Sequence, residues 1–322
     1  MRLNPVIYEH AARCAGLTPW LASRNAADMA QAHLAAWRIY HHSPVTVGID
    51  LYNPEPEAFG AIVAEPPGSA VPVIPEHLLR NCAGLAALKP LDPARDGRLP
   101  LILDAVARVR QGLPADMTVA VPVQGPFSCA AGLLGMENLV MAAQDDPAAL
   151  EGGLLHLAAM LAPWVEAVAA AGAGITIFES AAAPPMLSPR LFRKVAARPL
   201  AKLVSTASRA GGKPPFLVVG GDIAPIIGDL AASGCGGLII PAETDQARCL
   251  AVLADRPELR VRINLPIGAV VGSDAPAFAC ALATGRALAE RRAGAVLGSG
   301  VLPWDADPDL LSVRLGCRGA TA

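Results

Sequence analysis

The chain has 322 residues, of which 53% are hydrophobic and only 17% charged, and its formal net charge is −2. This length allows one large domain, and the many small apolar residues let such a domain bury much of its surface. The near-neutral charge and an aromatic content of 4% argue against nucleic acid as a partner, because nucleic-acid binding needs a basic surface and rings on which bases stack.

The sequence also argues against a membrane partner. It contains no run of 18 consecutive apolar residues, and residues 1–6 (MRLNPV) lack the apolar core of a signal peptide. Seven cysteines are scattered without a CxxC pair, which is typical of proteins in a reducing compartment. We therefore expect a cytoplasmic location.

The first 42 residues predict an N-terminal arm and a helix. An extended segment at 5–9 (PVIYE) precedes a helical stretch at about 26–40, for which Asn25 or Ser23 would be the N-cap. We expect residues 1–42 to pack on a barrel formed by residues 43–322, the two making a single domain. The Pro- and Gly-rich segment 65–75 is predicted to be a loop over the barrel mouth.

From residue 43 onward, apolar strand-like runs alternate with helical patterns. Several runs are continuously apolar, which is typical of parallel strands covered on both faces. Repeated strand–helix units predict a parallel α/β fold. Seven strands can be placed and an eighth cannot, so we predict an eight-stranded (β/α)8 TIM-type barrel. The expected strands cover residues 45–49, 118–123, 175–178, 216–219, 237–240, 259–263 and 295–297.

One strand-like segment ends in a carboxylate followed by a hydroxyl, as barrel enzymes present catalytic groups. This segment and three other motifs together resemble the uroporphyrinogen decarboxylase superfamily, which also contains methylcobamide-dependent methyltransferases. The likeness covers residues 5–314 and implies a TIM-type barrel enzyme. Its motifs are GAGITIFES at 172–180, LSPRLF at 187–192, GPF at 125–127 and GSGVLP at 298–303.

Two carboxylates are the candidate catalytic groups. The resemblance implies a catalytic Asp50, because a similar strand in the decarboxylases ends in the catalytic aspartate; the alternative is an Asp that caps a turn. The pair Glu179 and Ser180 aligns with an Asp-Ser pair at the same strand end in the decarboxylases. A carboxylate at an apolar barrel mouth loses solvation, so its pKa rises toward neutrality and suits acid–base work. Alternatively, Glu179 accepts hydrogen bonds from the loop that follows.

Further polar residues are expected to bind substrate. His10 lies on an arm that reaches the site in the superfamily, Asn264 follows a strand, and Gly221 allows close backbone approach to a flat ligand. The alternatives are a hydrogen-bonded structural histidine at His10 and a turn residue at Asn264. The complete predicted set is His10, Tyr52, Asn53, Gln124, Ser180, Gly221, Asp222, Asn264 and Ser299.

Two departures from the superfamily pattern narrow the function. Thiol-directed methyltransferases of the superfamily hold zinc with a His-x-Cys-Gly motif and a later Gly-Cys, whereas this chain has Val218, Gly220 and Val301 at those ligand positions. Zinc activates a thiol by stabilising its thiolate. We therefore expect no zinc at the family site and no thiol activation by that route.

The second departure concerns the decarboxylases, whose N-terminal arm carries two arginines that pair with substrate carboxylates. Here those positions hold His10 and Cys14, and Ser299 replaces the histidine of a C-terminal Gly-His-Gly. Because a porphyrinogen with eight carboxylates needs several cationic partners, these replacements disfavour it as a substrate.

The resulting hypothesis is a zinc-independent, corrinoid-dependent methyltransferase that acts on a small methyl donor or a pterin. The corrinoid would be carried by a separate partner protein, because the chain lacks an Asp-x-His-x-x-Gly segment, and no tightly bound cofactor is expected. The alternatives are a decarboxylase of a porphyrinogen or other pyrrole and a non-catalytic ligand-binding homologue. The oligomeric state is left open, with a homodimer as one option.

Overall fold

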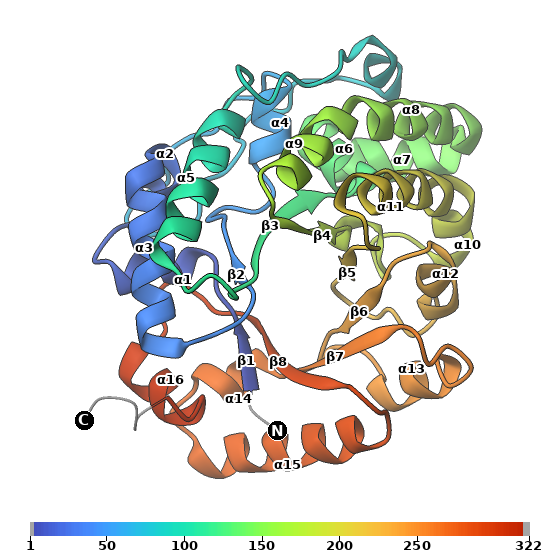
Figure 1. Cartoon of the computed structure of the whole chain (residues 1–322). Coiled ribbons are helices and arrows are strands. Elements are labelled where there is room, and N and C mark those ends of the chain that lie inside the picture. The colour runs from blue at the N-terminus through green and yellow to red at the C-terminus, as the bar shows by residue number, and fades with distance from the viewer. Residues whose placement is uncertain (1–2, 318–322) are drawn as a thin grey trace.

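The computed structural model describes residues 3–317 and shows eight parallel strands in one curled sheet surrounded by helices (Figure 1). The strand order is β1-β8-β7-β6-β5-β4-β3-β2, which confirms the predicted TIM-type α/β fold. The strands are β1 (Leu3–Val6), β2 (Val45–Thr46), β3 (Val119–Gln124), β4 (Gly174–Phe178), β5 (Phe216–Val218), β6 (Gly237–Ile240), β7 (Arg260–Leu265) and β8 (Val296–Val301).

The strand that the sequence left unplaced is β1, which lies in the segment expected to be an extended arm. It pairs in parallel with β8, where Leu3 is opposite Leu297. Strands β1 and β2 are the two edges of the sheet, and Asn4 Nδ2 donates a 2.6 Å hydrogen bond to the Ser43 carbonyl across the seam between them. The arm therefore supplies part of the barrel wall, while the proposed division after residue 42 stays a prediction.

The helices begin where the sequence supplies capping groups. Asn25 Oδ1 accepts hydrogen bonds from the amides of Ala27 and Asp28 at the start of α3, and Asp146 caps α8 ahead of Pro147. The helices are α1 (Glu9–Cys14), α2 (Pro19–Arg24), α3 (Ala26–Tyr40), α4 (Pro54–Ala58), α5 (Leu99–Gly112), α6 (Pro126–Leu134), α7 (Met136–Asp145), α8 (Pro147–Met160), α9 (Ala162–Ala170), α10 (Pro189–Leu191), α11 (Ala197–Gly211), α12 (Ile227–Ala232), α13 (Gln246–Val252), α14 (Ile267–Val271), α15 (Ala275–Glu290) and α16 (Pro308–Arg314), with the short helices η1 (Cys82–Ala87), η2 (Ser180–Ala182) and η3 (Phe192–Ala196).

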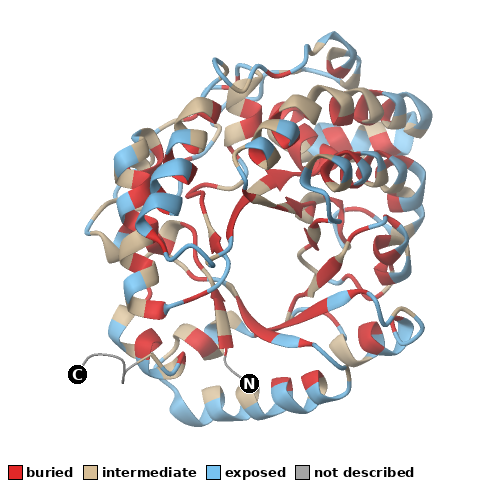
Figure 2. Ribbon diagram, viewed as in Figure 1, coloured by how far each residue is buried: buried red, intermediate tan, exposed pale blue. Residues whose placement is uncertain are grey.

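The hydrophobic core lies between the sheet and the helices around it. Figure 2 shows buried residues on the strands and on the helix faces turned toward them, with exposed residues on the outer faces. Large side chains such as Trp164, Phe127 and Phe192 are fully buried. Each buried apolar side chain of this size contributes roughly 1.5–3 kcal/mol, so this layer holds the barrel together.

One helical stretch of the described residues, Pro147–Ala170, is long and apolar enough to cross a membrane by length and composition alone. It comprises α8 and α9, which pack against α11 on the outside of the barrel. Of its most apolar window, 44% is buried inside the protein. Core helices of globular proteins share these properties, so the stretch is explained by its place in the fold.

Candidate active site

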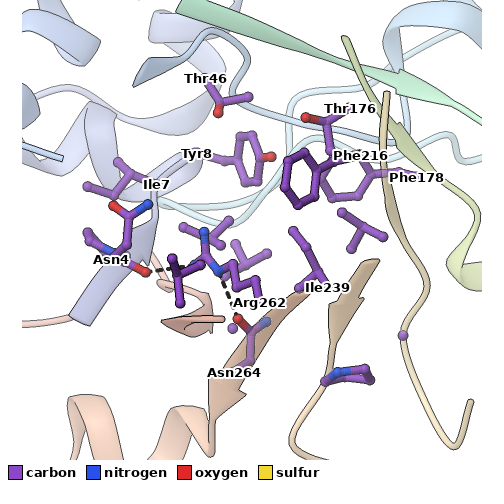
Figure 3. A pocket seen from close by; sticks show the side chains of 18 of the residues that line it. Asn4, Ile7, Tyr8, Thr46, Thr176, Phe178, Phe216, Ile239, Arg262 and Asn264 are labelled. Atoms are coloured by element: carbon purple, nitrogen blue, oxygen red, sulfur yellow. Dashed lines mark hydrogen bonds between the residues drawn. The ribbon is translucent and has the colours of Figure 1, made fainter. Parts of the chain in front are cut away.

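A cavity of about 520 Å³ lies inside the barrel, within the size range typical of ligand sites. The interior of a TIM barrel is usually filled by layers of side chains. Here several lining positions carry small residues, among them Thr46, Thr176, Gly220 and Gly300, and this leaves space. Aromatic and aliphatic side chains form much of the remaining wall, including Tyr8, Phe178, Phe216, Val218 and Ile239 (Figure 3).

Three of the predicted site residues line this cavity: Tyr52, Ser180 and Asn264. Tyr52 and Ser180 follow β2 and β4 and so lie toward the carboxyl ends of the strands. Ser180 Oγ accepts a 3.1 Å hydrogen bond from the Gly220 amide, which ties together two adjacent loops. Asn264 is the inward-facing residue near the end of β7, 7% exposed. The sequence therefore identified part of the cavity wall.

Asp50 does not line the cavity; it forms a buried ion pair with Arg98. The Arg98 Nη1 and Nη2 atoms donate to the two Asp50 oxygens at 2.7 and 2.8 Å, and Asn53 Nδ2 donates a third hydrogen bond at 2.9 Å. Asp50 and Arg98 are 2% and 5% exposed. Arg98 also binds Glu57. These contacts give Asp50 a structural role. Both of its oxygens are bonded within the protein and neither faces the cavity, so a catalytic role for Asp50 stays a prediction.

Glu179 is fully buried behind the cavity wall, against the start of α6. Its Oε1 and Oε2 accept hydrogen bonds from the amides of Phe127 (2.9 Å) and Ser128 (2.8 Å). Burial raises its pKa from 4.5 to about 7, although these hydrogen bonds pull it down. Desolvation is therefore the cause of the raised pKa, as expected. The carboxylate nevertheless lies outside the cavity lining and holds the start of α6 in place.

His10 and Ser299 also lie outside the cavity lining. His10 is fully buried, and its Nε2 is 2.7 Å from the Tyr40 hydroxyl while its Nδ1 is 3.2 Å from the Pro303 carbonyl. Ser299 Oγ accepts a 3.2 Å hydrogen bond from the Val6 amide and donates to the Gly300 carbonyl at 2.7 Å. Both side chains therefore stabilise the seam between the N-terminal and C-terminal parts of the chain.

The remaining predicted binding residues hold loops together. Asn53 bonds Asp50 and the Pro72 carbonyl, and Gln124 donates to the buried carboxylate of Glu55 from both its amide and its side chain, each at 2.9 Å. Gly221 has φ = +75°, and a Cβ there would lie 2.7 Å from the Pro184 carbonyl oxygen. Asp222 is exposed and accepts a 2.7 Å hydrogen bond from Thr244. These four positions do not line the cavity.

Arg262 and Tyr8 also line the cavity but were not among the predicted site residues. Arg262 is 8% exposed, and burial lowers its pKa from 12.5 to about 10. Its guanidinium passes over Gly298, where any Cβ would overlap Arg262 Nε. The sequence held a signal for Arg262. Arg260 and Arg262 alternate along the expected strand 259–263, so both side chains point to the same face of the sheet, and a buried arginine on a covered strand is rare unless it has a partner.

The three positions that the resemblance assigns to zinc ligands lie together on the lining of the cavity. Val218, Gly220 and Val301 all line it, but none of them carries an atom that can ligate zinc. Among residues 3–317 no group of three or more His, Cys, Asp or Glu side chains is arranged to hold a metal ion. The donor set at this place therefore does not fit zinc.

Comparison with known proteins agrees with this architecture. The family model of uroporphyrinogen decarboxylase (URO-D) matches residues 5–260, so the chain belongs to the URO-D family. Two forms of the methylcobamide:CoM methyltransferase MtaA, from Methanosarcina barkeri and its strain Fusaro, are 25% and 24% identical over 195 and 188 residues. These matches cover 60% and 58% of this chain and 56% and 54% of the relatives, so the chain spans about half the length of the curated relatives it matches.

Solved structures show the same fold. A methyltransferase from Methanosarcina mazei superposes with a TM-score of 0.84 at 19% identity, covering 98% of this chain and 93% of the other. A putative vitamin-B12 independent methionine synthase from Listeria monocytogenes gives a TM-score of 0.54 at 10% identity, with 98% and 96% covered. At these identities the likeness establishes the barrel and leaves the reaction to be argued from the site.

Proposed function

We propose that this chain is a methyltransferase of the URO-D family that works without zinc and binds a small methyl donor or a pterin in the barrel cavity. The observation that carries the proposal is that Val218, Gly220 and Val301 share this cavity. The resemblance assigns to these positions the zinc ligands of the superfamily's thiol-directed methyltransferases. The reacting group of the substrate would therefore lie where it lies in those methyltransferases, but it would be activated without zinc.

A corrinoid on a separate partner protein would supply the methyl-carrying cobalt. This chain would bind the small molecule, orient its reacting end toward the carboxyl ends of the strands, and exclude water. The cavity suits the last two tasks because its wall is largely apolar, with the hydroxyls of Tyr52 and Ser180 on its lining. Holding a reactant in one orientation supplies much of the rate in such transfers.

A proton donor for the leaving group must face the cavity, and Asp50 and Glu179 do not line it. Tyr52 does, and a phenol can act as a general acid. We therefore assign the proton transfer to Tyr52. Exchange of Tyr52 for Phe is expected to lower the rate of transfer by about 10²-fold or more and to leave substrate binding largely unchanged.

A decarboxylase is the second candidate, because the family whose model matches is named for that activity. The arm argues against a porphyrinogen substrate, since His10 bonds Tyr40 and Pro303 instead of facing the cavity. A further alternative is that the chain only binds a ligand in this cavity, and this alternative predicts no turnover.

The test is methyl transfer with free cobalamin in place of the partner protein. The purified chain is incubated with cob(I)alamin and a panel of methyl ethers, methylamines and methylated pterins, and the formation of methylcobalamin is followed by its absorption spectrum. The proposal predicts turnover with at least one donor class and loss of turnover in Tyr52→Phe. Release of carbon dioxide from uroporphyrinogen, or no transfer with any donor, would contradict it.

A further inference from the structure

We infer that the barrel cavity takes a ligand with a single carboxylate on an apolar body, and that Arg262, Tyr8 and Asn264 bind this carboxylate. The inference deepens the proposed function, on which it rests, because it names the substrate class for the same cavity. It is carried by hydrogen-bond donors that face the cavity without an acidic partner.

Arg262 is a buried cation that no carboxylate neutralises. Its Nε donates to Asn264 Oδ1 at 3.0 Å, and its Nη2 donates to the carbonyls of Asn4 (2.7 Å) and Ser299 (3.3 Å). All three acceptors are uncharged. Among the described residues no ion pair involves Arg262, and its Nη1 makes no hydrogen bond. A buried charge is costly unless it is paired, so this guanidinium lacks its counterion.

Two further donors line the same cavity. Tyr8 is 3% exposed, its hydroxyl makes no hydrogen bond to residues 3–317, and burial raises its pKa so that the phenol keeps its proton. Asn264 uses Oδ1 for Arg262, which leaves Nδ2 as a donor. Figure 3 shows the Arg262 guanidinium between Asn4 and Asn264, with Tyr8 among the labelled side chains that line the same cavity.

The hydrogen bonds of Arg262 Nε and Nη2 stabilise the barrel wall, but they do not account for Nη1. The bond from Nη2 to Asn4 joins β7 to β1 across β8, and it requires Gly298 in between. A neutral amide could make a similar bond at lower desolvation cost. A full charge on a side chain that lines the cavity, with Nη1 making no hydrogen bond to the described residues, points to an anion as the ligand.

The charge balance favours a monoanion. Two arginines line the cavity, but Arg260 is exposed and stacks on the Phe216 ring, so Arg262 supplies the one buried positive charge of the lining. Tyr8 and Asn264 supply neutral donors, so a carboxylate would be balanced and a phosphate dianion would leave excess negative charge in the barrel. The one acidic residue that lines the cavity, Glu243, is exposed and forms no ion pair with Arg262. It therefore does not compete for the guanidinium.

The rest of the ligand would be apolar. Phe178 and Phe216 line the cavity with Ile239 and Val218, and the Tyr8 and Phe178 rings meet edge to face at 5.8 Å. Such walls gain free energy by covering hydrocarbon or aromatic surface. A cavity of about 520 Å³ has room for a ring system together with its carboxylate.

The experiment measures binding by isothermal titration calorimetry with three carboxylates and their neutral amides: 2-naphthoate, phenylacetate and hexanoate. The wild type is expected to bind at least one carboxylate tenfold or more tightly than its amide. Arg262→Gln should weaken that carboxylate roughly 10- to 100-fold and leave the amide unchanged. Tyr8→Phe, which removes a hydroxyl with no partner in the protein, should weaken it about tenfold and keeps the test valid if Arg262→Gln does not fold.

Arg108→Gln is the matched control, because it removes the same charge from an exposed pair with Asp104 on α5; its carboxylate affinity should equal that of the wild type. Equal binding of carboxylate and amide, no binding of any pair, unchanged binding in Tyr8→Phe, or tighter binding of 2-naphthyl phosphate than of 2-naphthoate would overturn the inference. These measurements contain no cobalamin. Methyl transfer without carboxylate binding would therefore reject the carboxylate site alone, and carboxylate binding without transfer would reject the proposed function alone.

Discussion

The Asp50 carboxylate receives two hydrogen bonds from the Arg98 guanidinium, at 2.7 and 2.8 Å, and both side chains are at least 95% buried. This bidentate pair joins the loop that follows β2 to the start of α5. It also uses the two oxygens that a catalytic Asp50 would need for its substrate. Exchange of Asp50 can therefore distinguish a structural role of this carboxylate from a catalytic one.

Exchange of Asp50 for Asn is expected to cost stability. Removal of one partner from a buried ion pair leaves the other charge poorly compensated, which costs about 3–5 kcal/mol, and somewhat less here because Glu57 still binds Arg98. Urea unfolding measures this change. Asp229→Asn, which breaks the exposed pair with Arg193, is the control and should cost less than about 1 kcal/mol. Wild-type stability with lost turnover in Asp50→Asn would instead support a catalytic aspartate.

Glu179 makes stability fall as the pH rises. Its pKa is 4.5 in the unfolded reference and about 7 in the folded protein, so between these values the folded state binds more protons and the free energy of unfolding decreases with pH. The contribution is fully present below about pH 4.5 and lost above about pH 7, and it amounts to roughly 2–4 kcal/mol.

Glu179→Gln should reduce the difference in unfolding free energy between pH 5.5 and pH 8, since the variant cannot ionise there. Glu137→Gln, at an exposed position on α7, should keep the wild-type difference. Buried Glu55 shares the upward shift to about 7, so part of the slope will remain in Glu179→Gln. An identical slope in the wild type and Glu179→Gln would show that Glu179 does not titrate in this range.

Gly298 and Gly300 on β8 form a matched pair of test positions. A Cβ at Gly298 would overlap Arg262 Nε, whereas a Cβ at Gly300 would lie 3.5 Å from Ile267 Cβ, an ordinary contact. Gly298→Ala should therefore cost about 1–3 kcal/mol through overpacking and weaken carboxylate binding, while Gly300→Ala should leave stability nearly unchanged. Thermal unfolding compares them, and equal melting temperatures would contradict the packing of Arg262 over Gly298.

Elemental analysis of the purified chain is expected to find far less than one zinc per molecule, because Val218, Gly220 and Val301 supply no ligand atoms. The triple variant V218H/G220C/V301C is the positive control, since it restores the residue types of the superfamily motif at positions that share the cavity. One chelator-resistant zinc per wild-type chain would mean that other side chains hold a metal.

The strand pattern could be predicted from sequence because strands covered on both faces are continuously apolar, a signal that local reasoning detects. β1 was not predicted as a strand because it has only four residues and contains Pro5. The site was harder. Asp50 and Glu179 were identified as carboxylates at strand ends, but their partners, Arg98 and the amides of Phe127 and Ser128, lie about 50 residues away. Local sequence carries no information on whether such a carboxylate faces a cavity or a buried donor.

The rate of methyl transfer in Val218→Phe tests most directly whether the barrel cavity is the reaction site. Val218 lines the cavity, and the larger side chain would fill part of the space that the substrate needs. Val313→Phe, at a position on α16 that is 54% exposed, is the control. A reaction inside the cavity predicts loss of transfer in Val218→Phe with a retained fold, and unchanged transfer in Val313→Phe. Wild-type transfer in a folded Val218→Phe would contradict it.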